Sequence, residues 1–228
     1  RENIPEICVP ELPEDPAEYL EYLYTLNLFE TISFSNEDLA RTKLYQTEAK
    51  RATNQQKFTN EDDFLKALEM VSDVQVFNKF SKPRVAQLSQ RSNQFNLRTI
   101  RYNDDDIEKI SQNNEFYTFA FTLEDKYGDN GLICVIILNH QNADNVFIDT
   151  WFMSCRVLKR GMENFVLNTI VNFCKQKNYK NLIGEYLSTS KNEMVKNHYQ
   201  NLGFTEIDIL WELKVNDYQD KVTYILTK

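Results

Sequence analysis

Glycine, proline, cysteine and histidine are all scarce in this chain of 228 residues. It holds 5 glycines and 5 prolines, which excludes collagen-like and linker-rich proteins. No window approaches the roughly 18 consecutive apolar residues of a membrane-spanning helix, and no basic-then-apolar signal segment opens the chain. Hydrophobic residues make up 42% and charged residues 26%, as in ordinary globular proteins. We therefore expect a folded, soluble protein with no membrane partner.

The 4 cysteines and 2 histidines form no pattern of metal ligands. No two cysteines form a C-x-x-C pair, and neither His140 nor His198 stands at a ligand spacing from a cysteine. The sequence therefore predicts no metal site. Because no secretory signal is visible, the cysteines are expected to be reduced thiols in a cytoplasmic protein.

The net charge of −8 is concentrated at the start of the chain. Residues 1–50 hold eleven acidic and four basic residues, whereas the other 178 residues have a net charge of −1. An acidic chain disfavours general nucleic-acid binding, because phosphate backbones select basic surfaces. Residues 74–103 are the exception, with six bases and no acid. This stretch either attracts an acidic carrier protein or reflects chance and helix polarity.

Apolar spacing and turn residues predict an N-terminal helical segment followed by an α/β (α+β) domain. Helices are expected over residues 17–29 and 35–55, from Thr59, over 84–96, after Asn103, and over 162–177 and 191–202, the last one ended by Gly203. Strands are expected over residues 74–77, 115–123, 132–138, 146–153, 182–187, 204–213 and 222–227, with a hairpin turn at Asp129–Gly131.

The order of these elements predicts a mixed, mostly antiparallel sheet flanked by helices. The three strands between residues 115 and 153 form a meander, which is antiparallel. The strand–helix–strand step around residues 162–177 is parallel. A ligand crevice is expected where the antiparallel and parallel halves meet, at the carboxyl ends of the strands.

The segment from Ser154 to Glu163 is the first candidate site, because it joins a strand to a long helix. The free N–H groups at a helix start, helped by nearby cations, can hold a phosphate or pyrophosphate. The candidate cofactor-binding residues here are Cys155, Arg156, Lys159, Arg160, Gly161 and Met162. A solvated loop with surface bases is the alternative. The Cys155 thiol is either an acyl acceptor or a buried strand residue, and the lack of a neighbouring histidine favours the buried residue.

The second candidate segment runs from Ser188 to Phe204. Asn192 lies in the first turn of the predicted helix and Tyr199 seven residues later, so both are expected on one helix face. Tyr199 is a candidate general acid for a leaving thiolate, or else its ring packs against Phe204. Glu185, or alternatively Asp149, is a candidate catalytic base on the central strands, although buried acids there are often structural.

These two segments, in this order, resemble the GNAT fold of N-acetyltransferases. That fold carries R/Q-x-x-G-x-G/A before its long helix, and Arg156-x-x-Lys159-x-Gly161 stands at that place, with Lys159 where the first glycine is usual. It also carries an Asn…Tyr-x-x-x-Gly-Phe ending, matched here from Asn192 to Phe204. The resemblance covers about residues 70–228. It implies CoA or a phosphopantetheine thioester as cofactor, with Asn192 among the binding residues and Tyr199 catalytic.

Longer runs resemble the FkbH-like family, whose members fuse a haloacid-dehalogenase-type (subfamily IIIC) domain to a GNAT-like domain. The runs are VPELPEDP at 9–16, RVAQLSQRSNQFNL at 84–97, RY at 101–102, YGDNGL at 127–132 and SCRVLKRGME at 154–163. This resemblance implies that residues 1–57 are the tail of a haloacid-dehalogenase-like domain plus a helical linker, and that residues 58–228 are the GNAT-like domain. Because the sequence opens on Arg1, we expect a part of a longer protein.

The FkbH-like resemblance implies a role in loading a phosphoglycerate-derived glyceryl unit onto an acyl carrier protein, the first step toward methoxymalonyl extender units. The phosphatase motif D-x-D-x-T/V is missing, and Asp104–Asp106 is better explained as the acidic first turn of a helix behind Asn103. The expected function is therefore acyl transfer, with an acyl carrier protein and the preceding domain as partners. The alternatives are a non-catalytic carrier-protein-binding module, or an N-acetyltransferase acting on an amine.

Overall fold

A computed structural model describes residues 10–27 and 36–228, in two compact units. The first unit ends at Gln46 and the second runs from Thr47 to Lys228. The first contains the short 3-10 helix η1 (Pro16–Glu18), the helix α1 (Tyr19–Thr25) and the beginning of α2 (Asn36–Gln55). The boundary thus falls inside α2, earlier than the boundary after residue 57 that the sequence suggested. Most of the predicted tail strand over residues 1–12, Cys8 and the predicted helix start at Ser35 lie outside the described residues.

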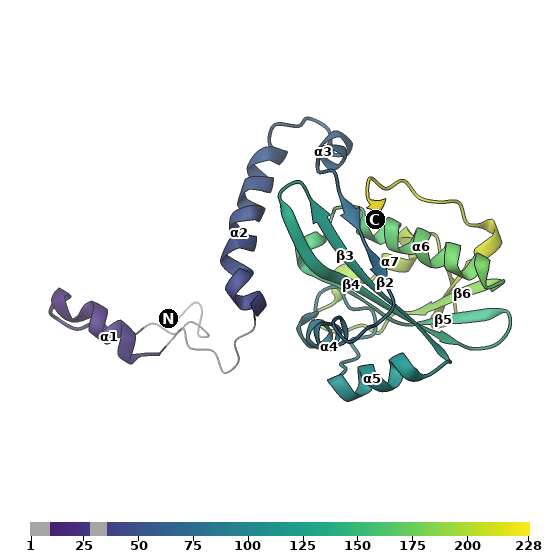
Figure 1. Cartoon of the computed structure of the whole chain (residues 1–228), viewed down its shortest axis with the longest axis horizontal. Coiled ribbons are helices and arrows are strands. Elements are labelled where there is room, and N and C mark those ends of the chain that lie inside the picture. Colours follow the sequence, from purple (N-terminus) through teal and green to yellow (C-terminus); the bar gives the residue numbers. More distant parts are fainter. Residues whose placement is uncertain (1–9, 28–35) are drawn as a thin grey trace. The chain divides into compact units, whose positions relative to one another are not determined.

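The second unit is built on one sheet, shown in Figure 1. Its strands are β1 (Val71–Ser72), β2 (Val74–Gln75), β3 (Phe116–Asp125), β4 (Gly128–His140), β5 (Asn145–Met153), β6 (Asn181–Glu185), β7 (Thr205–Ile207), β8 (Leu210–Lys214) and β9 (Leu226–Thr227). Their order is β7-β8-β6-β5-β4-β3-β1-β9, and β2 also pairs with β3. Among the described strands, β5–β6 and β1–β9 are parallel and the other pairs are antiparallel. The predicted mixed, mostly antiparallel sheet is confirmed.

Helices cover both faces of this sheet. They are α3 (Glu61–Ala67), α4 (Lys82–Arg91), α5 (Asp104–Gln112), α6 (Met162–Gln176) and α7 (His198–Asn201). Figure 1 shows α6 on one face and α4 and α5 on the other. Ile136 and Leu138 of β4 belong to the core under α6, whereas Val135 and Ile137 belong to the core under α4 and α5. Burial on both faces explains why residues 132–138 are an unbroken apolar run.

Local capping fixes the helices that flank the site. Asn103 and Asp106 form a capping box at the start of α5, so the Asp104–Asp106 run is the acidic first turn of a helix, as predicted. Gly161 precedes α6 with φ of 76°, a left-handed conformation that glycine adopts at little cost. Gly203 follows α7 with φ of 91°, as predicted for a helix end.

The predicted hairpin turn at Asp129–Gly131 is wrong. Asp125 of β3 pairs directly with Gly128 of β4, so the turn consists of Lys126 and Tyr127. Gly131, with φ of 68°, instead lies in a register shift of the β3–β4 ladder. A glycine in the left-handed region is the usual mark of a β-bulge, and the glycine signal therefore indicated a bulge rather than a turn.

The predicted helix over residues 191–202 is broken into the 3-10 turn η3 (Glu193–Val195) and α7. Asn192 and Tyr199 therefore do not share one helix face. The Asn192 side chain accepts a hydrogen bond from the Thr189 N–H (2.8 Å) and donates to the Leu187 carbonyl (2.9 Å). Such side-chain-to-backbone bonds compete with the helix. The final strand candidates are also shorter: residues 204–213 form the β7–β8 hairpin, and residues 222–227 keep only β9.

Candidate functional site

The expected crevice lies between β5 and β6. These parallel strands pair only from Asn145 to Phe147 and from Asn181 to Ile183, and the ladder stops there. From Ile148 to Met153, the edge of β5 that faces β6 therefore has no β6 partner. Free backbone groups along such an edge are what an extended, amide-containing ligand uses for binding.

The chain itself fills this space with residues 95–97, which we call the 95–97 segment. It runs antiparallel to β5, with Asn96 opposite Phe152. The Leu97 N–H donates to the Trp151 carbonyl (3.1 Å), and the Met153 N–H donates to the Phe95 carbonyl (3.0 Å). On its other side, the Leu97 carbonyl accepts from the Leu187 N–H (2.9 Å). The predicted crevice at this edge is thus occupied by an internal strand-like segment.

Side chains hold the 95–97 segment in place. Phe95 is 3% exposed and Leu97 is fully buried, so both contribute to the core. The Asn192 amide donates to the Asn96 carbonyl (2.9 Å), and this hydrogen bond fixes the segment to the loop that contains Asn192. The Asn96 side chain accepts from the Thr99 N–H (2.8 Å). Asn192 was predicted to bind a cofactor; in this form its amide is committed to the segment that closes the crevice.

Arg98 links the segment to the two candidate bases. Its Nε donates to the Glu185 carboxylate (2.7 Å), and its Nη1 donates to the Asp149 carboxylate (2.7 Å). Its guanidinium lies 5.0 Å from the centre of the Phe147 ring. Burial lowers the pKa of Arg98, but Asp149 and Glu185 raise it more, so the guanidinium stays charged. Glu185 and Asp149 therefore act here as ion-pair partners, the structural alternative for buried acids.

Tyr199 is a core residue in this structure. It is 1% exposed, and its hydroxyl has no hydrogen-bond partner among the described residues. Its ring lies against Phe204 (4.9 Å between centres) and so close to Gly184 that a Cβ on Gly184 would come within 2.3 Å of it. Burial raises the pKa of Tyr199 well above its usual value. The packing alternative is found, and the hydroxyl predicted as a general acid points into the protein.

The 154–163 segment is more open. Cys155 is exposed and begins the 3-10 turn η2 (Cys155–Val157), so the favoured prediction of a buried strand residue is wrong. Arg156 donates from its Nε to the Ser154 hydroxyl (3.2 Å). Lys159 is exposed, with φ of 62°, and Met162 is fully buried as the first residue of α6. Lys159, at the position where the GNAT pattern has a glycine, thus adopts a left-handed backbone, which is uncommon for a residue with a side chain.

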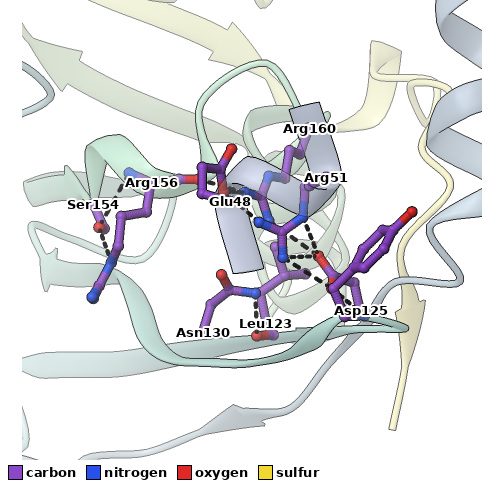
Figure 2. A network of polar contacts seen from close by, with 9 residues as sticks. Glu48, Arg51, Leu123, Asp125, Asn130, Ser154, Arg156 and Arg160 are labelled. Atoms are coloured by element: carbon purple, nitrogen blue, oxygen red, sulfur yellow. Dashed lines mark hydrogen bonds and ion pairs between the residues drawn. The ribbon is translucent and has the colours of Figure 1, made fainter. Parts of the chain in front are cut away.

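Arg160, a predicted cofactor-binding residue, is buried and forms ion pairs within the protein. Figure 2 shows it in a network with the buried Arg51 and Asp125 and with the exposed Glu48. Its Nη1 donates to Asp125 (3.2 Å), and its Nη2 donates to Glu48 (2.8 Å) and to the Arg156 carbonyl (2.8 Å). Burial, followed by the neighbouring Arg51, lowers the pKa of Arg160. The guanidinium is used to join α2, the end of β3 and the 154–163 segment.

A CoA-type cofactor meets two different environments here. The start of α6 has no side-chain cap among the described residues, and Lys159 and Arg156 lie beside it, which suits a phosphate. Glu163 lies in the same first turn, and burial raises the pKa of its carboxyl. The pantetheine arm, in contrast, has no open edge of β5 to follow, because the 95–97 segment occupies it. In this form the residues suit the phosphate end and do not fit the arm.

A pocket among the described residues lies elsewhere. It has a volume of about 380 Å³ and is lined by Ile100, Arg101, Tyr102, Asp106, Lys109 and Ile110. It therefore borders α5 and includes neither Tyr199 nor any residue of the 154–163 segment.

Among the described residues, no group of three or more His, Cys, Asp or Glu side chains is arranged to hold a metal ion. No helix in that part of the chain is long and apolar enough to cross a membrane.

Comparison with known proteins supports the fold. No family model and no curated protein matches the chain. Among solved structures, the ribosomal-protein-S18-alanine N-acetyltransferase from Escherichia coli matches 67% of this chain and 99% of its own length, with 11% identity and a TM-score of 0.50. A GNAT-family acetyltransferase from Staphylococcus aureus Mu50 matches 64% and 99%, with 14% identity and a TM-score of 0.50. The chain has the GNAT fold. At these identities the likeness establishes the fold and leaves the activity to be argued from the residues.

The residues that decide the state of the GNAT crevice were not among the sequence candidates. Arg98 looked like one base in an acid-free stretch, and the amide side chains of residues 93–96 could either cap the preceding helix or bind a ligand. His198, which packs against Phe95, looked like an isolated histidine. In the sequence there was only a weak signal that residues 95–97 pair with β5. They lie in a loop of mixed polar and apolar residues between two helices, which lacks the alternation of a strand.

Proposed function

We propose that this chain is the carrier-protein-binding, GNAT-fold domain of an FkbH-like protein, and that in its closed form it binds a partner rather than transferring an acyl group from CoA. The observation that carries this proposal is the 95–97 segment in the crevice between β5 and β6. A bound arm would have to displace two buried apolar side chains, Phe95 and Leu97. Exposing them costs roughly 3 to 6 kcal/mol, which weakens an otherwise favourable affinity by more than about 100-fold.

An exposed basic and apolar patch supports the choice of partner. Val76 is 69% exposed and Phe80 is 81% exposed, with the Lys79 ammonium 4.9 Å from the Phe80 ring centre. They precede α4 in the stretch that contains no acid. Other bases of that stretch are used internally: Lys82 pairs with Glu108 (2.8 Å), and Arg98 with Asp149 and Glu185. Lys79 and Phe80, with the exposed Val76 three residues before Lys79 in the chain, therefore offer a cation beside apolar surface, which suits an acidic carrier protein.

Titration calorimetry at neutral pH tests this function. We expect the apo and holo forms of a purified acyl carrier protein to bind this chain with similar affinity, because the contact is with the surface of the carrier protein. We expect titration with CoA to give no heat. Phe80→Ala and Lys79→Glu should each weaken carrier binding about tenfold. The matched controls, Ile209→Ala at a residue 78% exposed and Lys196→Glu, should change it little. Micromolar binding of CoA, or no binding of either carrier form, would contradict the proposal.

The second candidate function is acyl transfer to a carrier-protein thiol, including the glyceryl transfer of FkbH-like proteins. Cys155, exposed beside Arg156, and the uncapped start of α6 favour it. This function requires the 95–97 segment to leave the crevice. It predicts that the holo carrier binds at least tenfold more tightly than the apo carrier and that CoA competes. The calorimetric comparison of the two carrier forms therefore separates the two candidates.

A further inference from the structure

His198 lies under the 95–97 segment, enclosed by aromatic rings. Its ring centre is 4.5 Å from Trp151 of β5, with the planes at 88°, and 5.0 Å from Phe95, with the planes at 82°. Tyr199, on its own helix, is 5.8 Å away. The imidazole is therefore covered from above by Phe95, and Phe95 belongs to the segment that closes the crevice.

Buried polar atoms at this place, Trp151 Nε1 among them, lack hydrogen-bond partners among the described residues. Neither His198 Nε2 nor Tyr199 Oη has a hydrogen-bond partner among the described residues, and both atoms are buried. More than 90% of buried polar groups in folded proteins are hydrogen-bonded. The unpartnered His198 nitrogen beneath Phe95 makes the closed arrangement less favourable than its packing alone suggests. Phe95 is one of the rings that cover the imidazole, so its displacement would give water access to His198.

The cover is a loop and can leave without breaking the sheet. The 95–97 segment lies between α4 and α5, and β5 keeps its full ladder with β4 on the opposite edge. The segment is joined to the rest of the domain by three backbone hydrogen bonds, the Asn192 amide and the Arg98 ion pairs. All of these contacts are made by residues 95–98, so opening displaces this loop without global unfolding of the domain.

Among the described residues, no charged group contributes to the pKa of His198, so a proton there has no compensating charge. The groups that face the imidazole are Phe95 from the loop, Trp151 from β5 and Tyr199 from α7. Tyr199 is the only titratable one of these, and its pKa is raised, so it is neutral near pH 7. Burial is the sole cause that lowers the pKa of His198, to about 3. In the closed form the imidazole is neutral, and water-exposed imidazole takes up its proton near pH 6.5.

We propose that the 95–97 segment is a displaceable cover and that protonation of His198 favours its displacement, so that the space between β5 and β6 is open in a larger fraction of molecules at low pH. Above the pKa of an exposed histidine, the free-energy advantage of the closed form over the open form is complete. It decreases as the pH falls below that pKa, because only the open form accommodates the charged imidazole. Between pH 8 and pH 5 the open fraction should rise about 30-fold, from an exposed pKa near 6.5 and a closed pKa well below 5. This goes beyond the proposed carrier binding, which involves a different surface.

Amide hydrogen exchange of the full chain, corrected for the intrinsic pH dependence of exchange, tests the cover. The N–H groups of Leu97, Met153 and Leu187, which join the segment to its neighbours, should exchange about 30-fold faster in relative terms at pH 5 than at pH 8. The Phe204 N–H, bonded to the Tyr199 carbonyl at the end of α7, should not change in parallel. Equal acceleration at Phe204 would mean that α7 unfolds instead and would overturn the proposal.

The chain offers a matched pair of variants, because it contains 2 histidines. His198→Phe keeps an aromatic ring under Phe95 and cannot be protonated, so the pH response at Leu97 and Met153 should disappear. His140→Gln removes the other histidine, which contacts the Tyr179 hydroxyl, and should leave the response intact. A wild-type profile without acceleration between pH 8 and pH 5 overturns the proposal even if His198→Phe fails to fold. Loss of the response in His140→Gln overturns it as well.

Discussion

Lys159 and Arg160 are adjacent bases with opposite environments. Lys159 is exposed on a left-handed backbone, and Arg160 is buried in contact with Asp125 and Glu48. From the sequence, both cations were predicted to bind the cofactor. Their partners show that Lys159 is available to an anion and that Arg160 supports the architecture.

Replacing Arg160 should therefore change stability rather than anion binding. Arg160→Ala removes three hydrogen bonds from a buried network and leaves part of the Asp125 charge to Arg51 alone, so it should lower the free energy of unfolding by about 2–3 kcal/mol. Lys159→Ala, at an exposed neighbour, should change it by less than about 0.5 kcal/mol. Urea denaturation measures both. Equal, small effects would contradict the burial of Arg160.

Among the elements, β6 and α7 are joined at one close contact. Gly184 is the β6 residue against which the Tyr199 ring lies, and a Cβ there would be 2.3 Å from a ring carbon. The glycine is required by this approach and not by its backbone angles. The contact also explains why the hydroxyl of Tyr199 is enclosed: the strand, Phe204 and Trp211 surround the ring.

Gly184→Ala tests this contact. The added methyl group must displace the ring, and overpacking of this kind costs about 3 kcal/mol of folding free energy. The double variant Gly184→Ala with Tyr199→Leu should lose less than the sum of the two single variants, because the shorter side chain removes the clashing ring atoms. The double-variant cycle is measured by urea unfolding. Additive losses would show that the ring does not lie on β6.

At the scale of the whole molecule, the boundary of the second unit depends on an ion-pair network. Arg51, in the last turns of α2, donates from Nε and Nη2 to the two oxygens of the buried Asp125 carboxylate (2.9 and 3.0 Å). Residues from Thr47 onward therefore belong to the second unit, whereas the FkbH-like resemblance implied a linker up to residue 57.

Truncated chains should reveal this boundary. A chain that begins at Thr47 should unfold at the same urea concentration as the second unit of the full chain. A chain that begins at Phe58 lacks Arg51 and should lose about 3 kcal/mol, because Asp125 then lacks one of its two guanidinium partners. Arg51→Ala in the chain from Thr47 should reproduce that loss. Equal midpoints for both truncations would instead support a boundary after residue 57.

The sequence by itself determined the order of the elements and the class of fold. Apolar periodicity located β3, β4, β5 and α6, because these elements are long and their patterns depend only on neighbours in the chain. Asn103 with Asp106 located the start of α5 for the same reason. The GNAT-like resemblance followed from this order together with the residues around Gly161.

The tertiary structure alone decided the state of the candidate site. The 95–97 segment bonds to Trp151, Met153 and Leu187, which are more than fifty residues away in the chain, so no local pattern announces the pairing. The same holds for Arg160 with Asp125 and for Tyr199 against Gly184. A side chain's type sets which bonds it can form. Which of those bonds it does form depends on the groups that folding brings within 3 Å, and here they close the crevice that the sequence predicted to be open.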